Sequence, residues 1–563
     1  MRRIFISVAL GLLALSAGAQ DTYFAELLSR NNYYGTARSI GLGNAVTALG
    51  GDLGSVGINP AGSAVNSFGQ FTFTPAILFQ NTGVSAAADG VNFSSPSNTS
   101  HNKFNLPNIG GTIVCPTGNN YGLKRVTFGV ICNVTDTYLN YTGARMSNAS
   151  TSFLANLAAA AEGLSPSDMP DDLYAAYCAN QFGAYGPGNS YAGANQRWNV
   201  PSDGDRPQWD NAYAYVPGAV DQVSEYNTYG TKMDFIINLG FDISDSFYFG
   251  FNIGLPAVEY RRSERFSEYA GSSVVFPNEF YDQDGNPAGV TNWVSSVNAY
   301  KLNTDASGIY AKFGLIWLPT KSLRIGAAIQ TPTSLNIEDT WQYGASSSYE
   351  DSKFNGNAYS DIRSYNYRLR TPYVANAGVA YTIPGLGLVS VDYELTDYSV
   401  MKFSDTDSYF DGGTWDATNE ANSLFCGLSH SLRAGVEVTP FGGFSLRAGY
   451  SFVSDPERYA LDAYGSKITA ETWEGPRQML GELHYFKNAT HGFSFGAGYS
   501  SASSFFCDAA FRLTKYPTVY YSPYYYGNYA VYDKDRNLLG MDMPLERFGR
   551  SIFDVVLTLG WRF

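Results

Sequence analysis

The residues that could activate a nucleophile or bind a metal are few: His101, His430, His484 and His491. Only His430 has neighbours of a suitable type, Ser429 and Ser431, and hydrolysis by such a pair also needs an acid that orients the imidazole. No orienting acid can be identified, and the histidines are not spaced as metal ligands. Gly-x-Ser-x-Gly, phosphate-loop, Cys-x-x-Cys and His-Glu-x-x-His patterns are also missing. The sequence therefore predicts no enzyme, no metal site and no cofactor.

The amino-acid composition differs from that of most soluble enzymes. Aromatic residues make up 15 % of the chain, with 43 Tyr and 36 Phe, and charged residues make up only 15 %. A transmembrane β-barrel needs this combination, because lipid-facing side chains alternate with polar side chains that face the lumen. Five cysteines, an odd number at irregular spacing, argue against a disulfide framework.

The first nineteen residues have the order of a signal peptide. Arg2 and Arg3 precede an apolar run from Ile4 to Ala17, and Ala17-Gly-Ala19 supplies small residues for cleavage. The run is shorter than the roughly 20 residues that a membrane-spanning helix needs. Without Arg2 and Arg3, 34 basic residues stand against 50 acidic ones, a net charge of about −16. Such a chain lacks the basic face that nucleic acid requires, so nucleic acid is excluded as a partner.

The last eleven residues alternate strictly between apolar and other side chains. One face of this strand would carry six apolar side chains, those of Phe553, Val555, Leu557, Leu559, Trp561 and Phe563. A chain that ends on an aromatic residue after such a run resembles the signal that outer-membrane assembly machinery recognises. We therefore predict that this machinery is a partner during biogenesis and that the strand faces outer-membrane lipid.

The same alternation recurs along the chain, with ionisable residues on one face and Leu, Phe and Val on the other. An oily exterior around a polar interior is expected of a membrane barrel and is the reverse of a soluble sandwich. Fourteen strands are predicted, an even number as single-chain bacterial barrels have. They cover 68–80, 105–116, 123–137, 229–243, 245–262, 305–319, 322–341, 364–383, 386–404, 428–440, 443–455, 490–501, 503–515 and 551–563.

The connections between these strands alternate between short turns and long loops. Short periplasmic turns and longer extracellular loops are typical of outer-membrane barrels, so both termini are expected in the periplasm. The largest loop, 138–228, has two stretches of helical character, at 152–162 and 167–179. A loop of this length is usually functional. A solvated surface lobe with no part in transport is the alternative.

Residues 20–67, between the signal peptide and the barrel of residues 68–563, are rich in Gly and Ala. Glycine permits close backbone approach and unusual dihedral angles, which suits a segment held in a narrow space. Asn59-Pro60 indicates a turn where this segment ends. We predict that residues 20–67 form a hatch inside the barrel.

At these residues the sequence resembles the FadL-type transporters of Gram-negative outer membranes, which move long-chain fatty acids and other hydrophobic compounds. The resemblance lies in Gly41, Gly43, Asp52, Ser55, Asn59, Pro60, Ala61 and Gly62. It implies a fourteen-stranded barrel, ligand capture by extracellular loops, a gate formed by these hatch residues, and exit past the hatch or through a kinked third strand. Gly129 is a candidate for that kink. Alternatively, Gly129 faces the lumen and makes room for the hatch.

Tyrosines are abundant in the last long loop, at positions 520, 521 and 524–526. They would suit an amphipathic ligand, or equally the aromatic girdle and loop packing of any barrel. The leading function is passive uptake of a hydrophobic small molecule across the outer membrane. The alternative is a barrel component of a secretion or surface-assembly complex that binds a protein partner.

Overall fold

The computed structural model describes most of the chain after the first 21 residues. The described residues are 22–88, 91–92, 97–149, 151–184, 189–200, 202–203, 206–207, 213–218, 220–271, 274–281, 284, 286–406, 415–456, 460–461, 467–468, 489–501, 504–521, 524 and 545–563. The predicted signal peptide and Tyr525 and Tyr526 lie outside them. Within the described part, no helix is both long and apolar enough to cross a membrane.

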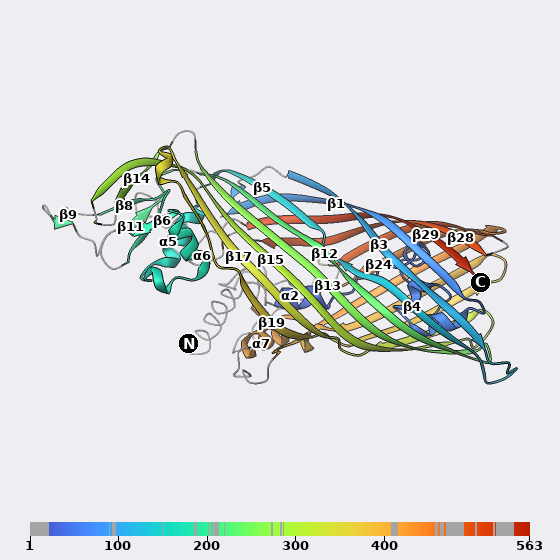
Figure 1. Ribbon diagram of the computed structural model, residues 1–563. Helices are drawn as coiled ribbons and strands as arrows, with labels where there is room; N and C mark the ends of the chain where they lie inside the picture. The colour runs from blue at the N-terminus through green and yellow to red at the C-terminus, as the bar shows by residue number, and fades with distance from the viewer. Residues whose placement is uncertain are drawn as a thin grey trace.

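Fourteen antiparallel strands form one closed barrel, which confirms the predicted fold class and strand number (Figure 1). The barrel closes where β1 pairs with β29, from Gln70 beside Arg562 to Ala87 beside Leu545. Ten strands run without interruption: β1 (Gln70–Ala88), β3 (Ser97–Pro116), β12 (Val220–Ile243), β13 (Phe247–Ala270), β15 (Pro287–Trp317), β23 (Leu428–Phe441), β24 (Phe444–Val453), β27 (Thr490–Ser500), β28 (Phe505–Tyr521) and β29 (Leu545–Arg562).

The remaining four barrel strands are each broken into two pieces. The pieces are β4 (Leu123–Thr137) with β5 (Asn140–Ala149), β16 (Leu323–Gln330) with β17 (Ser334–Tyr349), β19 (Arg363–Arg370) with β20 (Val374–Ile383), and β21 (Gly387–Asp397) with β22 (Lys402–Asp405). Pro332 and Pro372 fall in two of the breaks, where a missing N–H cannot join the ladder. A short 3-10 turn, η5 (Tyr398–Val400), fills a third.

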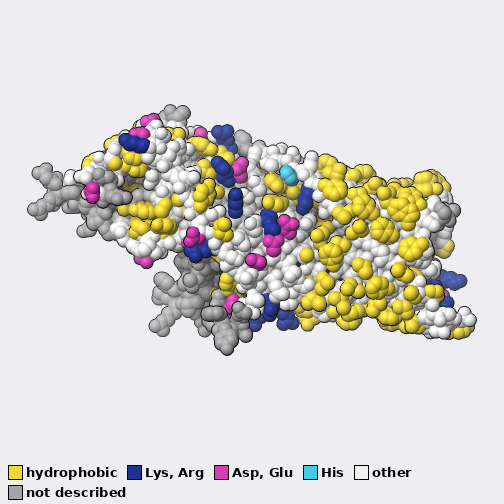
Figure 2. All heavy atoms as spheres, in the orientation of Figure 1, with side chains coloured by type: hydrophobic (Ala, Val, Ile, Leu, Met, Phe, Trp, Pro, Cys, Tyr) yellow, Lys and Arg dark blue, Asp and Glu magenta, His cyan; other side chains and the backbone are white. Residues whose placement is uncertain are grey.

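An apolar belt surrounds one end of the barrel, the end that carries the C-terminus (Figure 2). Every barrel strand contributes an exposed apolar side chain: Phe79, Ile113, Phe128, Phe235, Phe249, Phe313, Ile329, Val379, Val391, Leu432, Leu446, Phe495, Phe511 and Phe553. Charged side chains begin beyond the belt, toward the end with the long loops (Figure 2). A closed barrel with such a belt spans a membrane, because every strand is hydrogen-bonded and no edge meets lipid.

The strands extend further at the loop end than the alternation predicts. For example, β15 begins at Pro287 where the sequence predicts a strand from 305, and β12 begins at Val220 rather than 229. Beyond the belt no lipid selects apolar side chains for the outer face, which becomes polar, whereas buried side chains such as Trp293, Tyr300 and Leu302 lie on the inner face of β15. The pattern that reveals a membrane strand is absent there.

Short turns close the belt end. Ser244 and Asp245, between β12 and β13, both have positive φ, as a two-residue hairpin loop requires. The long connections lie at the other end (Figure 1). They include β2 (Val91–Asn92), β14 (Phe276–Tyr281), β18 (Gly356–Tyr359), η4 (Ser352–Phe354) and α7 (Asp416–Phe425), and four small hairpins that pair β6 (Phe182–Ala184) with β7 (Tyr191–Gly193), β8 (Arg197–Asn199) with β11 (Tyr213–Tyr215), β9 (Ser202–Asp203) with β10 (Arg206–Pro207), and β25 (Ala460–Leu461) with β26 (Lys467–Ile468).

The longest connection folds into a compact lobe at the loop end, which we call the loop lobe (151–184 and 189–200). It contains α5 (Phe153–Ala161), η2 (Pro166–Asp168) and α6 (Asp171–Cys178). Apolar side chains of both α-helices pack against Phe266, Phe276 and Trp293 at the ends of the neighbouring strands. The lobe therefore has a core of its own that continues into the barrel wall.

The N-terminal segment, residues 22–69, lies inside the barrel (Figure 1). It consists of α2 (Thr22–Ser29), α3 (Ala37–Gly41), α4 (Leu53–Val56) and η1 (Pro60–Val65), and it leads into β1. Almost every side chain from Tyr33 to Ala64 is buried. The four elements are short, and tertiary contacts with the wall rather than helical propensity hold them in place.

Candidate functional site: an occluded lumen with an apolar chamber

Local hydrogen bonds fold the N-terminal segment into tight turns. The Asn59 amide donates to Thr47 O (2.7 Å), and its Oδ1 accepts from the backbone N–H of Ala61 (3.1 Å), which caps η1. Pro60 occupies the first position of that helix, where its missing N–H has no cost. Ser55 Oγ donates to Asp52 O (2.6 Å). The residues behind the family resemblance thus include those that shape this segment.

Three glycines among the residues that carry the family resemblance lie where two stretches of backbone come together. Gly43 has φ +64° and lies against the backbone of Tyr450, where a Cβ would be closer than 3.0 Å to main-chain atoms. Gly62 packs against Gly50 within the segment, and Gly41 packs against Gly496 of the wall. The carboxylate of Asp52 accepts from the Thr36 hydroxyl at 2.6 Å. Glycine is needed at 43 both for its backbone angle and for the space.

Side chains of the wall bind the carbonyl groups of the segment. Asn238 donates to Pro60 O (3.0 Å), Asn252 to Val56 O (2.9 Å), and Lys312 to Gly57 O (2.9 Å). In the opposite sense, Asp392 accepts from the Thr47 N–H at 2.6 Å. These donors and acceptors replace water for buried peptide groups, so the segment is docked by directed bonds from several strands.

A row of wall glycines allows the segment to approach without intervening side chains. At each of them a Cβ would lie closer than 3.0 Å to an atom of residues 42–63: Gly240, Gly250, Gly314, Gly326, Gly378, Gly435 and Gly449. The row follows the strand register, because Gly250 lies opposite both Gly240 and Gly314, and Gly435 lies opposite Gly449. The segment therefore lies directly against the wall at this level of the lumen.

A chain of buried and partly buried charges ties α3 to the wall. Arg38 pairs with Glu437 (3.2 Å), Glu437 also binds Arg447 (2.5 Å), and Arg447 reaches Asp508 (2.5 Å). Each charge has an opposite partner, as burial in the lumen requires. Removal of the Glu437 carboxylate would take this partner from both Arg38 and Arg447.

On the loop side of residues 33–65, the lumen forms an apolar chamber, and the helix α2 occupies it. The lumen-facing side chains around it are unusually large, and many are aromatic: Tyr138, Val258, Tyr260, Tyr300, Leu302, Leu335, Ile337, Tyr367, Leu369, Tyr398, Met401, Phe403 and Trp415. Phe24, Leu27 and Leu28 of α2 fill the centre. The ring of Phe24 meets that of Tyr260 edge-on at 5.4 Å. A polar water-filled pore would not contain such a cluster.

The end of α2 is fixed beside the third barrel strand. Lys232 donates to Leu28 O (3.0 Å) and to Arg30 O (3.1 Å). The backbone N–H of Asn32 donates to Thr135 O (2.6 Å), and that of Tyr34 to Val134 O (2.9 Å). Residues 32–34 are therefore hydrogen-bonded through their backbone to the C-terminal end of β4.

Among the described residues, the ladder between β3 and the third strand ends at Asn108 and Asn133. The third strand itself breaks at Tyr138 and Leu139. Gly129 lies before both points and faces the lumen, paired with Thr112 on one side and Asn238 on the other. A lateral opening at Gly129 remains a prediction.

One buried acid holds the loop lobe on the wall. Glu268 accepts from the backbone N–H groups of Phe153 (2.8 Å) and Leu154 (3.1 Å), the first turn of α5. Gln222 donates to the same carboxylate (2.7 Å) and also to the Tyr524 hydroxyl (2.9 Å). Tyr524 is thus a packing residue that joins the last loop to the lobe.

The remaining sequence candidates are placed as follows. Phe553, Val555, Leu557, Leu559, Trp561 and Phe563 alternate with the buried residues of β29 and lie on its outer face. Their recognition by assembly machinery stays a prediction. Ser429 and Ser431 are buried on the lumen face of β23, whereas His430 lies on the other face against the Tyr393 hydroxyl (2.7 Å). The strand geometry separates these candidates for a nucleophile and a base. Within the described part, no group of three His, Cys, Asp or Glu residues could hold a metal.

The fold and this interior define a transmembrane barrel whose lumen contains its own N-terminal segment. No protein-family model matches the chain, and a search of curated proteins found no match. Solved structures that resemble it include a Pseudomonas aeruginosa FadL homologue (TM-score 0.45, 13 % identity, 95 % of this chain and 98 % of that one). Others are the toluene transporters TodX of P. putida (0.45, 13 %, 94 % and 99 %) and TbuX of Ralstonia pickettii (0.43, 13 %, 94 % and 99 %). The barrel itself is established by its strand pairing, independently of these similarities.

Proposed function

We propose that this chain is a channel for passive uptake of hydrophobic small molecules across the outer membrane of a Gram-negative bacterium, with residues 22–69 as its hatch. The observation that carries the proposal is the apolar chamber around α2, which is lined by large aromatic and aliphatic side chains. Transfer of an apolar molecule from water into such a chamber is favourable and needs no ATP. In this arrangement the loop end faces outward, the C-terminal end of the barrel faces the periplasm, and α2 lies inside the lumen on the loop side of the docked residues 33–65.

The helix α2 supports the proposal, since it supplies apolar groups where a ligand would bind. Phe24, Leu27 and Leu28 are buried, whereas Tyr23 on the same helix is 47 % exposed. A hydrophobic ligand would compete with the three buried side chains for one chamber. Displacement of α2 is then the first step of opening, and release past the docked segment is the second.

The test combines uptake with binding. Cells that lack the protein should take up labelled long-chain fatty acid or toluene more slowly than complemented cells, and identical rates would contradict the proposal. The double variant Phe24→Ala/Leu28→Ala should bind a fluorescent fatty acid more tightly, because a larger fraction of the chamber is free. Tyr23→Ala is the matched control and should leave the affinity unchanged.

The alternative function, a component of a secretion or assembly complex, predicts a different result. The purified barrel would then carry a stoichiometric protein partner and no lipid-like molecule, and α2 variants would not change the binding of hydrophobic compounds.

A further inference from the structure

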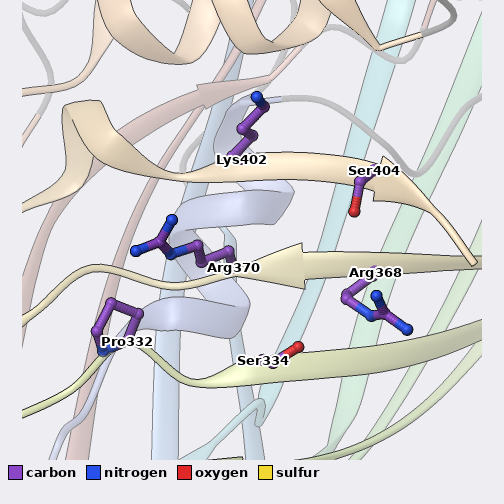
Figure 3. A pocket seen from close by; sticks show the side chains of 6 residues that line it. All are labelled: Pro332, Ser334, Arg368, Arg370, Lys402 and Ser404. Atoms are coloured by element: carbon purple, nitrogen blue, oxygen red, sulfur yellow. The ribbon is translucent and has the colours of Figure 1, made fainter. Parts of the chain in front are cut away.

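A pocket of about 420 Å³ lies on the outer wall of the barrel and has no part in the proposed transport path (Figure 3). Its lining comes from three adjacent strands, with Ser334 on β17, Arg368 and Arg370 on β19, and Lys402 and Ser404 on β22, together with Pro332. The pocket is thus lined by three cationic side chains from two neighbouring strands.

Strand alternation shows that these cations point away from the lumen. Tyr367, Leu369 and Phe403 alternate with them and are fully buried in the cluster around α2. Arg370 and Lys402 are exposed, and Arg368 is half-buried. The pocket is therefore accessible to lipid or solvent outside the barrel, and not to the lumen.

The register places like charges against each other. Arg370 lies directly opposite Lys402, and Arg368 lies opposite Ser404. Directly opposed like charges destabilise a strand pair. Arg368 donates to Asn336 Oδ1 (3.0 Å), but in the described part of the chain none of the three cations forms an ion pair. Glu338, the nearby outward-facing acid on β17, is not paired with them either. A bound anion would relieve this repulsion.

The position of the pocket along the barrel axis indicates which kind of anion would bind there. Ile329 and Tyr373, at the adjoining ends of the strands below, are 52 % and 51 % exposed and belong to the rim of the apolar belt. The cations come immediately after this rim, on the loop side. In a membrane protein this is the depth of the lipid headgroups, where basic pockets bind phosphorylated lipids.

We infer that Arg368, Arg370 and Lys402 bind the phosphate group of a phosphorylated lipid in the leaflet at the loop end. Two guanidinium groups can each bind phosphate oxygens in pairs, and the lysine adds a third charge. The acyl chains of such a lipid would lie along the apolar belt below. The inference needs only that the belt spans a membrane, and it does not depend on what the lumen transports.

The test uses the full-length barrel, purified in a neutral detergent. Binding of a bis-phosphorylated glucosamine lipid is compared with binding of the same lipid after removal of its phosphates, by native mass spectrometry and by titration. The wild type should prefer the phosphorylated lipid, and Arg368→Gln/Arg370→Gln/Lys402→Gln should lower its affinity by at least about tenfold. The charge-retaining variant Arg368→Lys/Arg370→Lys should bind with an affinity between those of the wild type and the triple Gln variant, because it keeps the charges but loses the paired hydrogen bonds of the guanidinium groups.

A matched control removes three charges elsewhere on the outer surface, at Lys301, Lys321 and Lys515, each of which is exposed. An equal loss of binding in Lys301→Gln/Lys321→Gln/Lys515→Gln would overturn the inference, because it would show a general charge effect. Unchanged binding by the pocket variant would also overturn it. Inorganic phosphate at the same concentration should not displace the lipid; full displacement would assign the pocket to a free anion and contradict a lipid site. Unchanged heat-modifiable gel mobility shows that each variant is folded.

Discussion

At the residue scale, the contact between the barrel wall and the N-terminal segment depends on glycines, which have no side chain to separate the two backbones. Gly250 and Gly314 leave no space for a Cβ against Pro60, and Gly435 leaves none against Leu42. Backbone approaches backbone, and Asn238, Asn252 and Lys312 are then close enough to bind carbonyl groups. The fit is fixed by covalent geometry and cannot be relieved by a change of rotamer.

Gly250→Val should therefore force Pro60 and the segment around it from the wall. We expect a loss of about 1–3 kcal/mol of stability, as for overpacked cores, and a raised conductance in planar bilayers. Gly549→Val is the control, because only Thr518 Oγ1, at 4.0 Å, lies near its Cβ position. Equal conductance of the two variants would show that the segment does not close the lumen.

Glu26 makes the docking of α2 sensitive to pH. Burial raises the pKa of Glu26 from its ordinary 4.5 to about 7, although Arg30, 3.9 Å away, lowers it. The docked helix thus favours the protonated acid. Docking is strongest below the ordinary pKa and weakens as the pH rises through about 7.

Hydrogen exchange of residues 22–29, corrected for intrinsic rates, should show protection that falls between about pH 5 and about pH 9. Glu26→Gln should keep the protection and remove its pH dependence. A wild-type protection that rises with pH would contradict the assignment.

At the element scale, the parts of each strand inside the belt could be predicted from the sequence, and the parts beyond it could not. Lipid on one side and polar lumen on the other enforce alternation along Phe553 to Phe563, whereas the first third of β15 has a polar outer face and packs Trp293 into the core of the loop lobe on its inner face. The Gly-rich turns of residues 41–62 were recognisable from composition. The helix α2 and its chamber were not, because Tyr260, Tyr367 and Trp415 are far apart in sequence and meet only through barrel closure.

The pocket cations were missed for a related reason. Arg368 and Arg370 alternate with Tyr367 and Leu369, so the rule that apolar side chains face lipid would direct these two cations into the lumen. Only the register of β19 against β22 reveals that Lys402 faces Arg370. Pairing between strands carries this information, and one strand alone does not.

The helix α5 depends on Glu268 for its first turn. Glu268→Ala would leave the N–H groups of Phe153 and Leu154 buried without this acceptor, at a cost of about 1–3 kcal/mol. We expect faster proteolysis and faster hydrogen exchange in residues 151–184, with the barrel itself unchanged. Glu225→Ala, an exposed acid on β12, should have neither effect. Uniform loss of protection over barrel and lobe alike would refute a local role.

At the scale of the whole molecule, the apolar belt determines where a charge can be tolerated. Phe495, on β27 within the belt, is 65 % exposed, and Ile362, beyond it, is 68 % exposed. An arginine at position 495 must enter lipid, whereas one at 362 remains in water. Phe495→Arg should cost about 2–4 kcal/mol in reversible unfolding from lipid vesicles, and Ile362→Arg close to nothing. Similar losses of stability at both positions would show that the membrane-spanning belt has been assigned to the wrong part of the barrel.

The length of the strands also fixes how far the barrel stands out from the bilayer. β15 has 31 residues, which at about 3.4 Å each and a tilt near 45° correspond to a height of roughly 70 Å. The hydrocarbon band of such barrels is only about 25 Å tall. The mouth is therefore raised well above the headgroup layer. A hydrophobic molecule that enters there leaves water before it meets the polar surface of the membrane, so the rate of its entry should be insensitive to how thick or how charged that surface layer is.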